Sequence, residues 1–366
     1  MEDIIRIDEN SWRIEDGHVR FLLFCGAERA ALIDTGMNRP DARQIAESLT
    51  DLPIILINTH ADRDHISGNC GFDEFYMSPA EEEHYRSQGG KGKLNPIREG
   101  DVIDLGGRPL RIIDIPGHTQ GSIAILDEKN RVLVSGDSVQ DGNIFMFGAH
   151  RDMDLYIAGL EHLALYDGLY DEIYPMHGTF PVKPDLTRKL IAGAKEIMDG
   201  LATGTRVDMF GKPVCLYKFP YAGFLCELPE VKEYKHTVRY YETDRMGITH
   251  HSNYIRWMEE ARLDYMKQLG WGYEKMEKEG IISPVTEVEC KYKLSTTFPD
   301  DVYIAVSVAE MRGVKLKLKY MMKNADGKVV CEAASVHCFL GKDGRILQLK
   351  KEYPEFHQML VDRMEG

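Results

Sequence analysis

Four segments in the first half of the sequence place histidine or aspartate directly after a short apolar run, and this feature constrains the fold most. The first is Thr59–His65, Thr-His-Ala-Asp-Arg-Asp-His, which follows the run Ile54–Ile57. The other three are centred on His118, Asp137 and His177, and each of these residues follows another short apolar run in the sequence. Short runs rich in Ile, Leu and Val predict strands. Strand ends that meet at one edge of a sheet can hold ligands rigidly around metal, so the pattern predicts a metal-binding domain.

Alternating strands and helices are predicted around these segments. The expected strands span residues 19–24, 30–34, 53–58, 110–115, 131–135 and 172–176, and the expected helices span 39–49, 154–166 and 184–198. Between residues 201 and 228, glycine and proline surround one apolar run, Val214–Tyr217, which predicts a single closing strand. This order is typical of an α/β domain.

The ordered set resembles the metallo-β-lactamase superfamily, particularly its glyoxalase II-like hydrolases. The gaps are 53 residues from His65 to His118, 19 to Asp137 and 40 to His177, which is similar to the spacing in that family. The segment Ile33-Asp34-Thr35-Gly36 also matches a family element in which the acid supports the ligand loop. The resemblance covers roughly residues 5–227 and implies an αββα sandwich.

The resemblance also implies a site for two divalent ions. One ion would be bound by His60, Asp62 and His118, the other by Asp64, His65 and His177, with Asp137 bridging them. Asp64 is predicted to be catalytic as well. The implied reaction is hydrolysis of an ester or thioester by a metal hydroxide, because coordination lowers the pKa of water from about 15.7 towards 7.

Asp62 departs from the family pattern, in which most members have histidine at this position. Two divalent ions carry +4, so three carboxylates leave +1 where the usual two leave +2. We therefore expect a weaker Lewis acid and a preference shifted from zinc, the family default, towards iron or manganese. A carboxylate here also looks like the di-iron flavodiiron branch, although that branch uses glutamate and this chain has no flavodoxin-like domain.

A second domain is predicted beyond a linker at residues 228–233, which contains Pro229. Residues 1–227 hold 23 basic and 37 acidic side chains, whereas the remainder is balanced. The expected elements of the second domain are strands at 235–241, 284–294, 302–308, 315–320 and 329–339 and a helix at 252–269. Gly270 ends the helix, Asp326-Gly327 predicts a hairpin turn, and the domain is placed at 234–350 with a helical tail at 351–366.

The segment from Val238 to Tyr254 joins the first of these strands to the helix and contains the pattern Asp244-Arg245-Met246-Gly247. With the flanking strand and helix it resembles the hotdog-fold acyl-CoA thioesterases of the 4-hydroxybenzoyl-CoA thioesterase type, over roughly residues 234–345. The resemblance implies an α+β domain in which an antiparallel sheet wraps one long helix, and it implies a homodimer or a higher assembly.

In this reading a carboxylate faces the N-terminus of the helix. The amides and the positive dipole end near residues 251–254 would stabilise the thioester oxygen as it gains charge. Asp244 would act as nucleophile or as general base for water. The alternative is that Asp244 has only a structural role, at the start of a turn. Of His250 and His251, one would contact substrate and the other would cap the helix, and His251 is the catalytic candidate.

Other candidates have weaker signals. Lys315, Lys317 and Lys319 share one face of a strand, where they would meet the phosphates of coenzyme A or form a solvated face. Isolated histidines are interpreted as ordinary loop residues; these are His84, His150 and His162.

Composition limits the partners and the compartment. A net charge of −14 argues against nucleic acid or an anionic membrane as the main partner. No run approaches the roughly 18 apolar residues of a membrane helix, and no signal peptide is recognised at the N-terminus. Seven cysteines form no Cys-x-x-Cys pair, which favours reduced thiols and the cytoplasm.

Together these features predict a bifunctional hydrolase of small-molecule thioesters, with acyl-CoA hydrolysed in the hotdog domain and an ester or thioester in the metal domain. Two alternatives remain. Either the metal domain alone is catalytic and the hotdog domain supplies dimerisation and ligand binding, or the acidic ligand set marks a di-iron redox protein.

Overall fold

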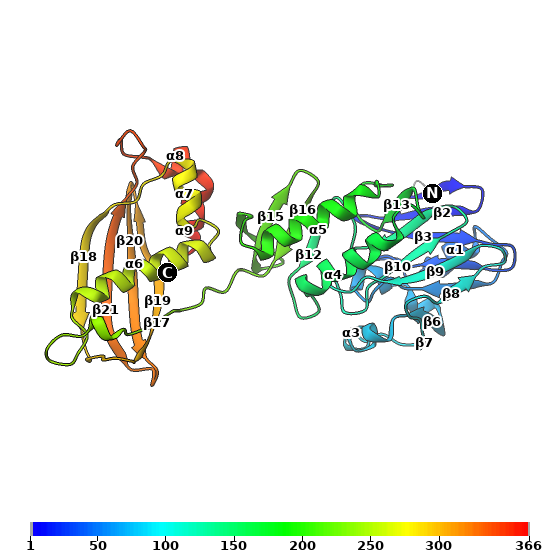
Figure 1. The fold of residues 1–366 in the computed structure, drawn as a ribbon. Helices are drawn as coiled ribbons and strands as arrows, with labels where there is room; N and C mark the ends of the chain where they lie inside the picture. Colours follow the sequence, from blue (N-terminus) through cyan, green and yellow to red (C-terminus); the bar gives the residue numbers. More distant parts are fainter. Residues whose placement is uncertain (1–2, 365–366) are drawn as a thin grey trace. The chain divides into compact units, whose positions relative to one another are not determined.

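The structure is a computed structural model that describes residues 3–364, and it contains two compact units (Figure 1). The first unit comprises the chain up to Met198 together with Leu216–Glu227. The second comprises Asp199–Cys215 and the chain from Leu228 onward. The domain boundary expected after residue 227 stays a prediction, and the structure adds that Asp199–Cys215 groups with the second unit.

A seven-stranded sheet forms one layer of the first unit. Its strands lie in sequence order: β1 (Ile4–Asp8), β2 (Ser11–Asp16), β3 (Val19–Cys25), β4 (Ala30–Ile33), β5 (Ile54–Ile57), β6 (Glu74–Met77) and β7 (Lys93–Pro96). Strands β1 to β4 pair antiparallel, and β4 to β7 pair parallel. The strands expected at residues 19–24 and 30–34 and the strand before the Thr59–His65 motif are where the sequence predicted them.

A five-stranded sheet faces the first. Its order is β13 (Glu172–Pro175), β11 (Val132–Gly136), β10 (Ile123–Asp127), β9 (Pro109–Asp114) and β8 (Val102–Asp104). Buried side chains from both sheets share one apolar cluster, including Phe24 and Ile57 from the first sheet and Ile112, Ile125 and Val134 from the second. Because both sheets bury apolar area between them, this layer is the main core of the unit.

Helices cover the outer faces of the two sheets, as expected for an αββα sandwich (Figure 1). They are α1 (Ala42–Glu47), α2 (Arg63–Ile66), α3 (Glu82–Ser87), α4 (Met153–Leu163) and α5 (Asp185–Met198). Ala42 and Tyr85 pack with Phe21 and Leu32 on the outer face of the seven-stranded sheet. The helix expected at residues 39–49 is therefore present but is shorter.

The segment between residues 201 and 228 corrects the prediction of a single strand. It contains β14 (Gly204–Met209), β15 (Lys212–Phe219) and β16 (Ala222–Cys226), in a sheet ordered β12-β16-β15-β14 with β12 (Asn143–Met146). Phe210 and Gly211 both have positive φ, 56° and 78°, which is the geometry of a two-residue hairpin turn. The glycine that indicated a loop thus makes a tight turn between two strands.

An antiparallel sheet and one long helix form the second unit. The sheet order is β17 (Tyr234–Thr237), β19 (Asp301–Arg312), β20 (Lys315–Asn324), β21 (Val329–Cys338) and β18 (Val285–Tyr292). Helix α6 (Ser252–Gln268) lays Tyr254, Trp257 and Met258 into a core with Val302 and Leu318 of the sheet. This is the hotdog arrangement that the sequence predicted.

Smaller differences occur within this unit. The strand expected to reach residue 241 ends at Thr237, and Tyr240–Glu242 form a 3-10 turn, because the Glu242 carboxylate accepts hydrogen bonds from the backbone at Arg239. Helix α7 (Tyr273–Glu279) was not predicted. The predicted hairpin turn joins β20 to β21. Of the helical tail predicted at 351–366, the end of α8 (Leu349–Glu352) and α9 (Pro354–Asp362) are helical, and residues 365–366 lie outside the described residues.

Two global properties complete the description. Within residues 3–364, no helix combines the length and the apolar character needed to cross a membrane. All seven cysteines lie in this part of the chain, and none of them forms a disulfide bond there.

Candidate functional site

The structure brings all seven predicted metal ligands together. They form two groups in which the potential ligand atoms lie within 4.8 Å of one another: His60, Asp62 and His118; and Asp64, His65, Asp137 and His177. This division is the one that the resemblance implied. Even the rings are close, since the centroids of His60 and His65 are 4.1 Å apart.

Asp137 lies between the two groups. Its Oδ1 is 3.3 Å from Nε2 of His65, and its Oδ2 is 3.2 Å from Nε2 of His177. The same Oδ2 is 3.7 Å from Nε2 of His118, which belongs to the other group. The position of Asp137 is therefore compatible with the predicted bridging role.

The ligands come from both sheets rather than from one sheet edge, which corrects the expectation. The Thr59–His65 motif follows β5 of the seven-stranded sheet, whereas His118, Asp137 and His177 follow β9, β11 and β13 of the other sheet. Because the two sheets pack face to face, their strand ends meet at one rim. The site therefore lies where both sheets contribute loops.

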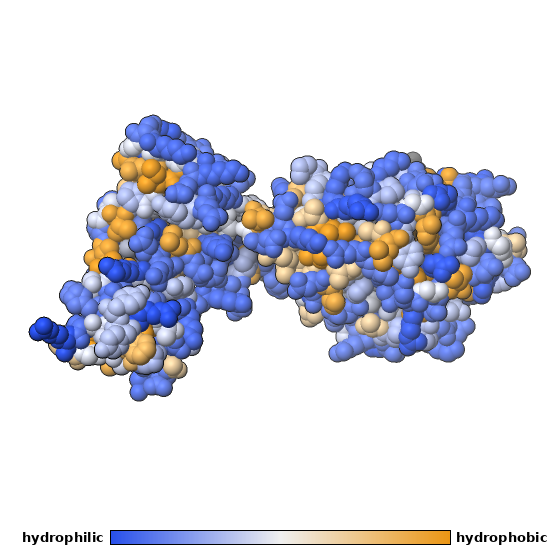
Figure 2. All heavy atoms as spheres, viewed as in Figure 1, coloured by the Kyte–Doolittle hydropathy of each residue, from blue (hydrophilic) through white to orange (hydrophobic). Residues whose placement is uncertain are grey.

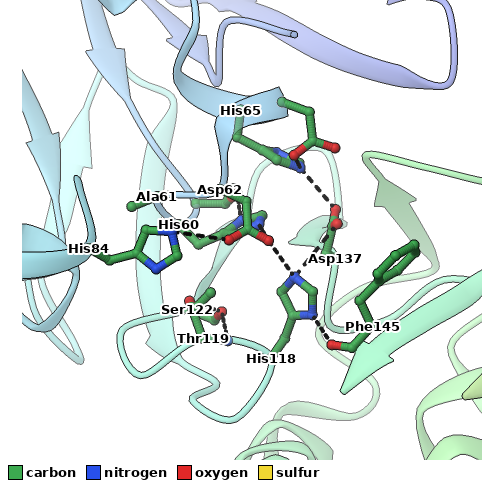
Figure 3. Close-up of polar contacts among 12 residues, drawn as sticks. His60, Ala61, Asp62, His65, His84, His118, Thr119, Ser122, Asp137 and Phe145 are labelled. Atoms are coloured by element: carbon green, nitrogen blue, oxygen red, sulfur yellow. Dashed lines mark hydrogen bonds and ion pairs between the residues drawn. The ribbon is translucent and has the colours of Figure 1, made fainter. Parts of the chain in front are cut away.

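Each histidine is oriented through its Nδ1 atom. Nδ1 of His60 is 3.0 Å from Oγ1 of Thr59, and Nδ1 of His65 is 2.9 Å from Oδ2 of Asp34. Nδ1 of His118 is 3.1 Å from the Phe145 carbonyl (Figure 3), and Nδ1 of His177 is 2.6 Å from the His18 carbonyl. Such outer contacts fix the ring and its tautomer, so that Nε2 faces the centre.

Four of the inward-facing atoms make no hydrogen bond within the described chain. Nε2 of His60, His65 and His118 and Oδ1 of Asp137 are buried and make no hydrogen bond to any described residue. Buried polar atoms normally have a partner, so this cluster indicates a missing ligand. Three to four nitrogen and oxygen donors in each group fit a divalent metal ion.

Asp34 supports the motif, as the family element implied. It is fully buried and adopts a positive φ of 62°, which is uncommon for a residue other than glycine. Its carboxylate accepts hydrogen bonds from N and Oγ1 of Thr59 at 2.8 and 2.7 Å, in addition to its contact with His65. One buried acid thus positions two adjacent parts of the ligand loop.

Glu81 has a similar role that the sequence did not reveal. It is 1% exposed, and its two carboxylate oxygens accept hydrogen bonds from the amides of Ala61 at 2.8 Å and Gly121 at 2.6 Å. The first amide lies between His60 and Asp62, and the second lies three residues beyond His118. Glu81 is the first of three consecutive glutamates, a pattern that predicts a solvated surface segment.

Asp62 has two further neighbours from distant parts of the chain. Nη2 of Arg151 is 2.5 Å from its Oδ2, and Nε2 of His84 is 3.5 Å from its Oδ1 (Figure 3). The His84 ring also lies 4.0 Å from that of His150. The interpretation of His84 and His150 as ordinary loop residues was therefore wrong, whereas His162 lies outside this cluster and contacts Glu99.

The charges of the groups follow from these contacts. Burial alone would raise the pKa of Asp62, but contacts with His118, His60 and Arg151 hold it well below its usual value. Burial also opposes the charged form of His177, yet neighbouring Asp137 and Asp64 raise its pKa to about 10. The carboxylates are thus anionic and attract cations, which a metal ion would satisfy in place of protons.

In the second unit, Asp244 begins a tight turn. Its Oδ1 accepts a hydrogen bond from the Met246 amide at 2.7 Å, and the Gly247 amide donates to its carbonyl at 3.0 Å. The residue as a whole is half-buried. The turn role that the sequence left open is therefore present, and it is compatible with a catalytic role for the other oxygen.

The two adjacent histidines behave differently. Nδ1 of His250 is 2.8 Å from Oγ of Ser252, the first residue of α6, whereas the N-cap position of that helix is held by His251 without a side-chain cap hydrogen bond. His251 is exposed, stacks on His250 at 4.2 Å, and uses its carbonyl to accept a hydrogen bond from the Tyr292 hydroxyl. His251 remains the predicted candidate for substrate contact.

A buried polar network lies under this turn and was not predicted. The carboxylate of Glu242 accepts hydrogen bonds from Nε1 of Trp257 at 2.8 Å and contacts Nε2 of His236 at 3.0 Å. Nδ1 of His236 is in turn 3.2 Å from Glu260. These contacts join the turn to α6 and β17, so the position of Asp244 rests on a rigid base.

The strand lysines face outward. Lys315 and Lys319 are exposed and Lys317 is half-buried, while the alternate residues Leu316 and Leu318 are in the core. Lys315 lies 3.8 Å from Glu287 on a nearby strand. This arrangement fits the solvated strand face, and coenzyme A contacts at Lys315 and Lys317 remain a prediction.

Two families match the chain. The metallo-beta-lactamase superfamily matches residues 15–192, and the thioesterase-like superfamily matches residues 238–363. Both matches agree with the folds described above.

Individual relatives divide in the same way. "Putative acyl-CoA thioesterase YneP" of Bacillus subtilis (strain 168) is 35% identical over 121 residues, covering 33% of this chain and 88% of that protein. "Acyl-coenzyme A thioesterase MBLAC2" of Homo sapiens is 28% identical over 196 residues, covering 42% and 70%. A solved DHNA-CoA thioesterase from Staphylococcus aureus is 33% identical, with coverage of 36% and 89% and a TM-score of 0.35. The chain is therefore a hydrolase that belongs to the thioesterase-like superfamily through its second part and carries a metallo-beta-lactamase superfamily domain in its first.

Proposed function

We propose that the chain is a bifunctional hydrolase of acyl thioesters, with one active site in each unit and coenzyme A as the carrier at the hotdog site. The observation that carries the proposal is the convergence of seven candidate ligands, four of which have a buried atom that makes no hydrogen bond within residues 3–364. The names of the relatives support the substrate class, because acyl-CoA thioesterases are found among the relatives of both halves.

In the first unit, two divalent ions would be held by the two ligand groups, with Asp137 between them. Bound ions of this kind lower the pKa of water and polarise a carbonyl group. The protein fixes the ligands through Asp34, Thr59 and the Phe145 carbonyl. The side chains of Asp64 and His177 are 22% and 20% exposed, whereas His60 and His118 are 1% exposed, so substrate would enter at the second group.

A cleft of about 700 Å³ in the first unit supports an anionic carrier. Thr179, two residues after His177 in the sequence, lines it, and its amide donates to Asp141 at 2.8 Å. Lys183 and Lys218 line the cleft, although residues 1–227 as a whole carry a net charge of −14. The cleft also holds an aromatic pair, Phe219 and Tyr221. Cations and aromatic rings are the groups that bind phosphates and a base.

In the second unit, Asp244 would act as nucleophile or general base, and His251 would contact substrate. We also propose a homodimer. The outer strand β18 exposes Val285, Val288 and Tyr292 by 50%, 41% and 47%, and apolar atoms lie along the edge of the second unit where Figure 1 places this strand (Figure 2). An apolar edge strand is suited to pairing with another chain. The lack of disulfide bonds among the described residues supports a cytoplasmic location.

The experiment compares acyl-CoA turnover by the full chain with and without a chelator, in the wild-type protein and in Asp244→Asn. Two independent sites predict that each treatment removes part of the activity and that both together remove all of it. Asp326→Asn, in the exposed turn between β20 and β21, is the matched control and should leave turnover unchanged.

The scaffold alternative is supported by the hydrogen bond that already engages Asp244 in a turn. It predicts that chelation removes all turnover and that Asp244→Asn removes none. Activity that fully survives chelation would contradict a catalytic metal domain. Iron in protein purified without added metal, together with O₂ or NO consumption, would instead indicate the di-iron redox class.

A further inference from the structure

We propose that Arg151 is a positioning residue of the first ligand group, which neutralises the charge that Asp62 adds and fixes both Asp62 and His118. The proposal concerns how this chain holds metal, and it does not depend on which substrate is hydrolysed. It starts from the departure at Asp62, where the resemblance implies histidine in most members.

The guanidinium contacts Asp62 directly and is linked to His118 through a shared carbonyl. Nη2 of Arg151 is 2.5 Å from Oδ2 of Asp62, and its Nε donates a hydrogen bond to the Phe145 carbonyl at 3.2 Å. The same carbonyl is 3.1 Å from Nδ1 of His118 (Figure 3). One side chain, 12% exposed, therefore joins the carboxylate ligand to the group that orients a histidine ligand.

The backbone near Arg151 is fixed to the same loop. The amide of Asp152 donates to the Gly117 carbonyl at 2.9 Å, and Gly117 immediately precedes His118. Asp152 also caps α4, because its Oδ1 accepts a hydrogen bond from the Leu155 amide at 2.9 Å. These hydrogen bonds hold together the start of α4, the loop that contains His118, and Arg151. The guanidinium group therefore has a fixed position relative to both ligands.

The ion pair between Arg151 and Asp62 changes the net charge of the metal site that was expected from the sequence. Three carboxylates and two divalent ions leave +1, and Arg151 returns the total to +2, the value for two carboxylates with a neutral histidine. The expectation of a weaker Lewis acid therefore omitted a cation that only the fold supplies. Because the ion pair is largely shielded from solvent, its contribution is screened less than that of a surface pair.

The contributions of Arg151 and Asp62 to metal binding should depend on each other. In the presence of Asp62, loss of Arg151 leaves an uncompensated carboxylate that is free to turn away from the ion. In the Asp62→His background, Arg151 becomes an unpaired cation beside the ion, so its loss should help. The effect of removing Arg151 should therefore change sign with the side chain at this position.

The test is a double-mutant cycle read by zinc binding rather than by activity. Wild type, Arg151→Met, Asp62→His and the double variant are stripped of metal and titrated with Zn²⁺ against a chromophoric chelator. We expect Arg151→Met to weaken one of two sites by about 10- to 100-fold, the range for residues that orient ligands. The double variant should bind within about threefold of wild type.

Two controls separate this role from general damage. Arg131→Met removes an exposed arginine that pairs with Asp171, and it should leave zinc binding unchanged. Arg151→Lys keeps the charge but loses the planar fork, and it should recover part of the affinity lost in Arg151→Met. Far-UV circular dichroism checks the fold of each variant.

Three results would overturn the proposal. They are unchanged zinc affinity in Arg151→Met, an equal loss from Arg151→Met in the wild-type and Asp62→His backgrounds, and a lysine variant no better than methionine. If Arg151→Met does not fold, the Arg151→Lys and double variants still decide the question. Catalytic failure of either domain would leave the zinc titration unaffected, so the proposed function is tested separately.

Discussion

The stability of the second unit should depend on pH through His337. This side chain lies on β21 and is 1% exposed, with Nε2 2.7 Å from Oγ of Ser335, which is 2.9 Å from the Tyr320 hydroxyl. Burial and the nearby positive charge of Arg262 lower the pKa of His337 from 6.5 to about 4. The folded unit therefore keeps the imidazole neutral at a pH where an unfolded chain would protonate it.

The sign and size follow from linkage. Between pH 6.5 and 4 the unfolded state binds a proton that the folded state does not, so this contribution to stability is present above pH 6.5 and is lost as the pH falls towards 4. At about 1.4 kcal/mol per pH unit, the loss between pH 7.5 and 4.5 is about 2.5 kcal/mol.

The assay is urea unfolding followed by tryptophan fluorescence in a Trp12→Phe background, which leaves Trp257 and Trp271 in the second unit as reporters. We compare this protein with the same protein carrying His337→Gln at pH 7.5, 6.0 and 4.5. The glutamine variant should lose about 2.5 kcal/mol less over this range, whatever its stability at pH 7.5.

His357→Gln on α9 is the matched control and should keep the pH dependence of the parent protein. Other groups also titrate in this range, and the comparison removes their shared contribution. Equal losses in the parent and in His337→Gln would refute the argument, because they would mean that His337 gains its proton equally in both states.

Three further predictions concern the first unit. Gly117→Ala should weaken zinc binding by about tenfold or more in a competition titration, because a Cβ atom there would lie 2.1 Å from the Tyr156 amide nitrogen at a φ of +129°. Arg108→Met should lower the free energy of urea unfolding by about 3–5 kcal/mol, since it leaves the fully buried Asp127 without its ion pair at 2.7 Å; unchanged stability would show that the pair is dispensable. Lys218→Glu should raise KM for acyl-CoA about tenfold in the Asp244→Asn background while zinc binding stays constant, and an unchanged KM would remove the cleft as the carrier site.

Much of the site could be predicted because each ligand is tied to a local pattern. Apolar runs of four to six residues form β5, β9, β11 and β13, and the ligands stand directly behind them in the sequence. The long helix of the second unit was predicted for the same reason, since its apolar side chains recur every three or four residues. Strand, helix and ligand position are thus properties of neighbouring residues.

The sequence alone determined the two folds, the seven candidate ligands and the motif around Asp244, because these depend on patterns within short segments. Only the tertiary structure decided what surrounds Asp62. Arg151 is 89 residues away from it along the chain, and the fold places the segment before α4 next to the Thr59–His65 motif. The same holds for Glu81 and His84, whose partners lie in other loops. Charge balance at a site is a sum over neighbours in space, and a sequence lists neighbours only along the chain.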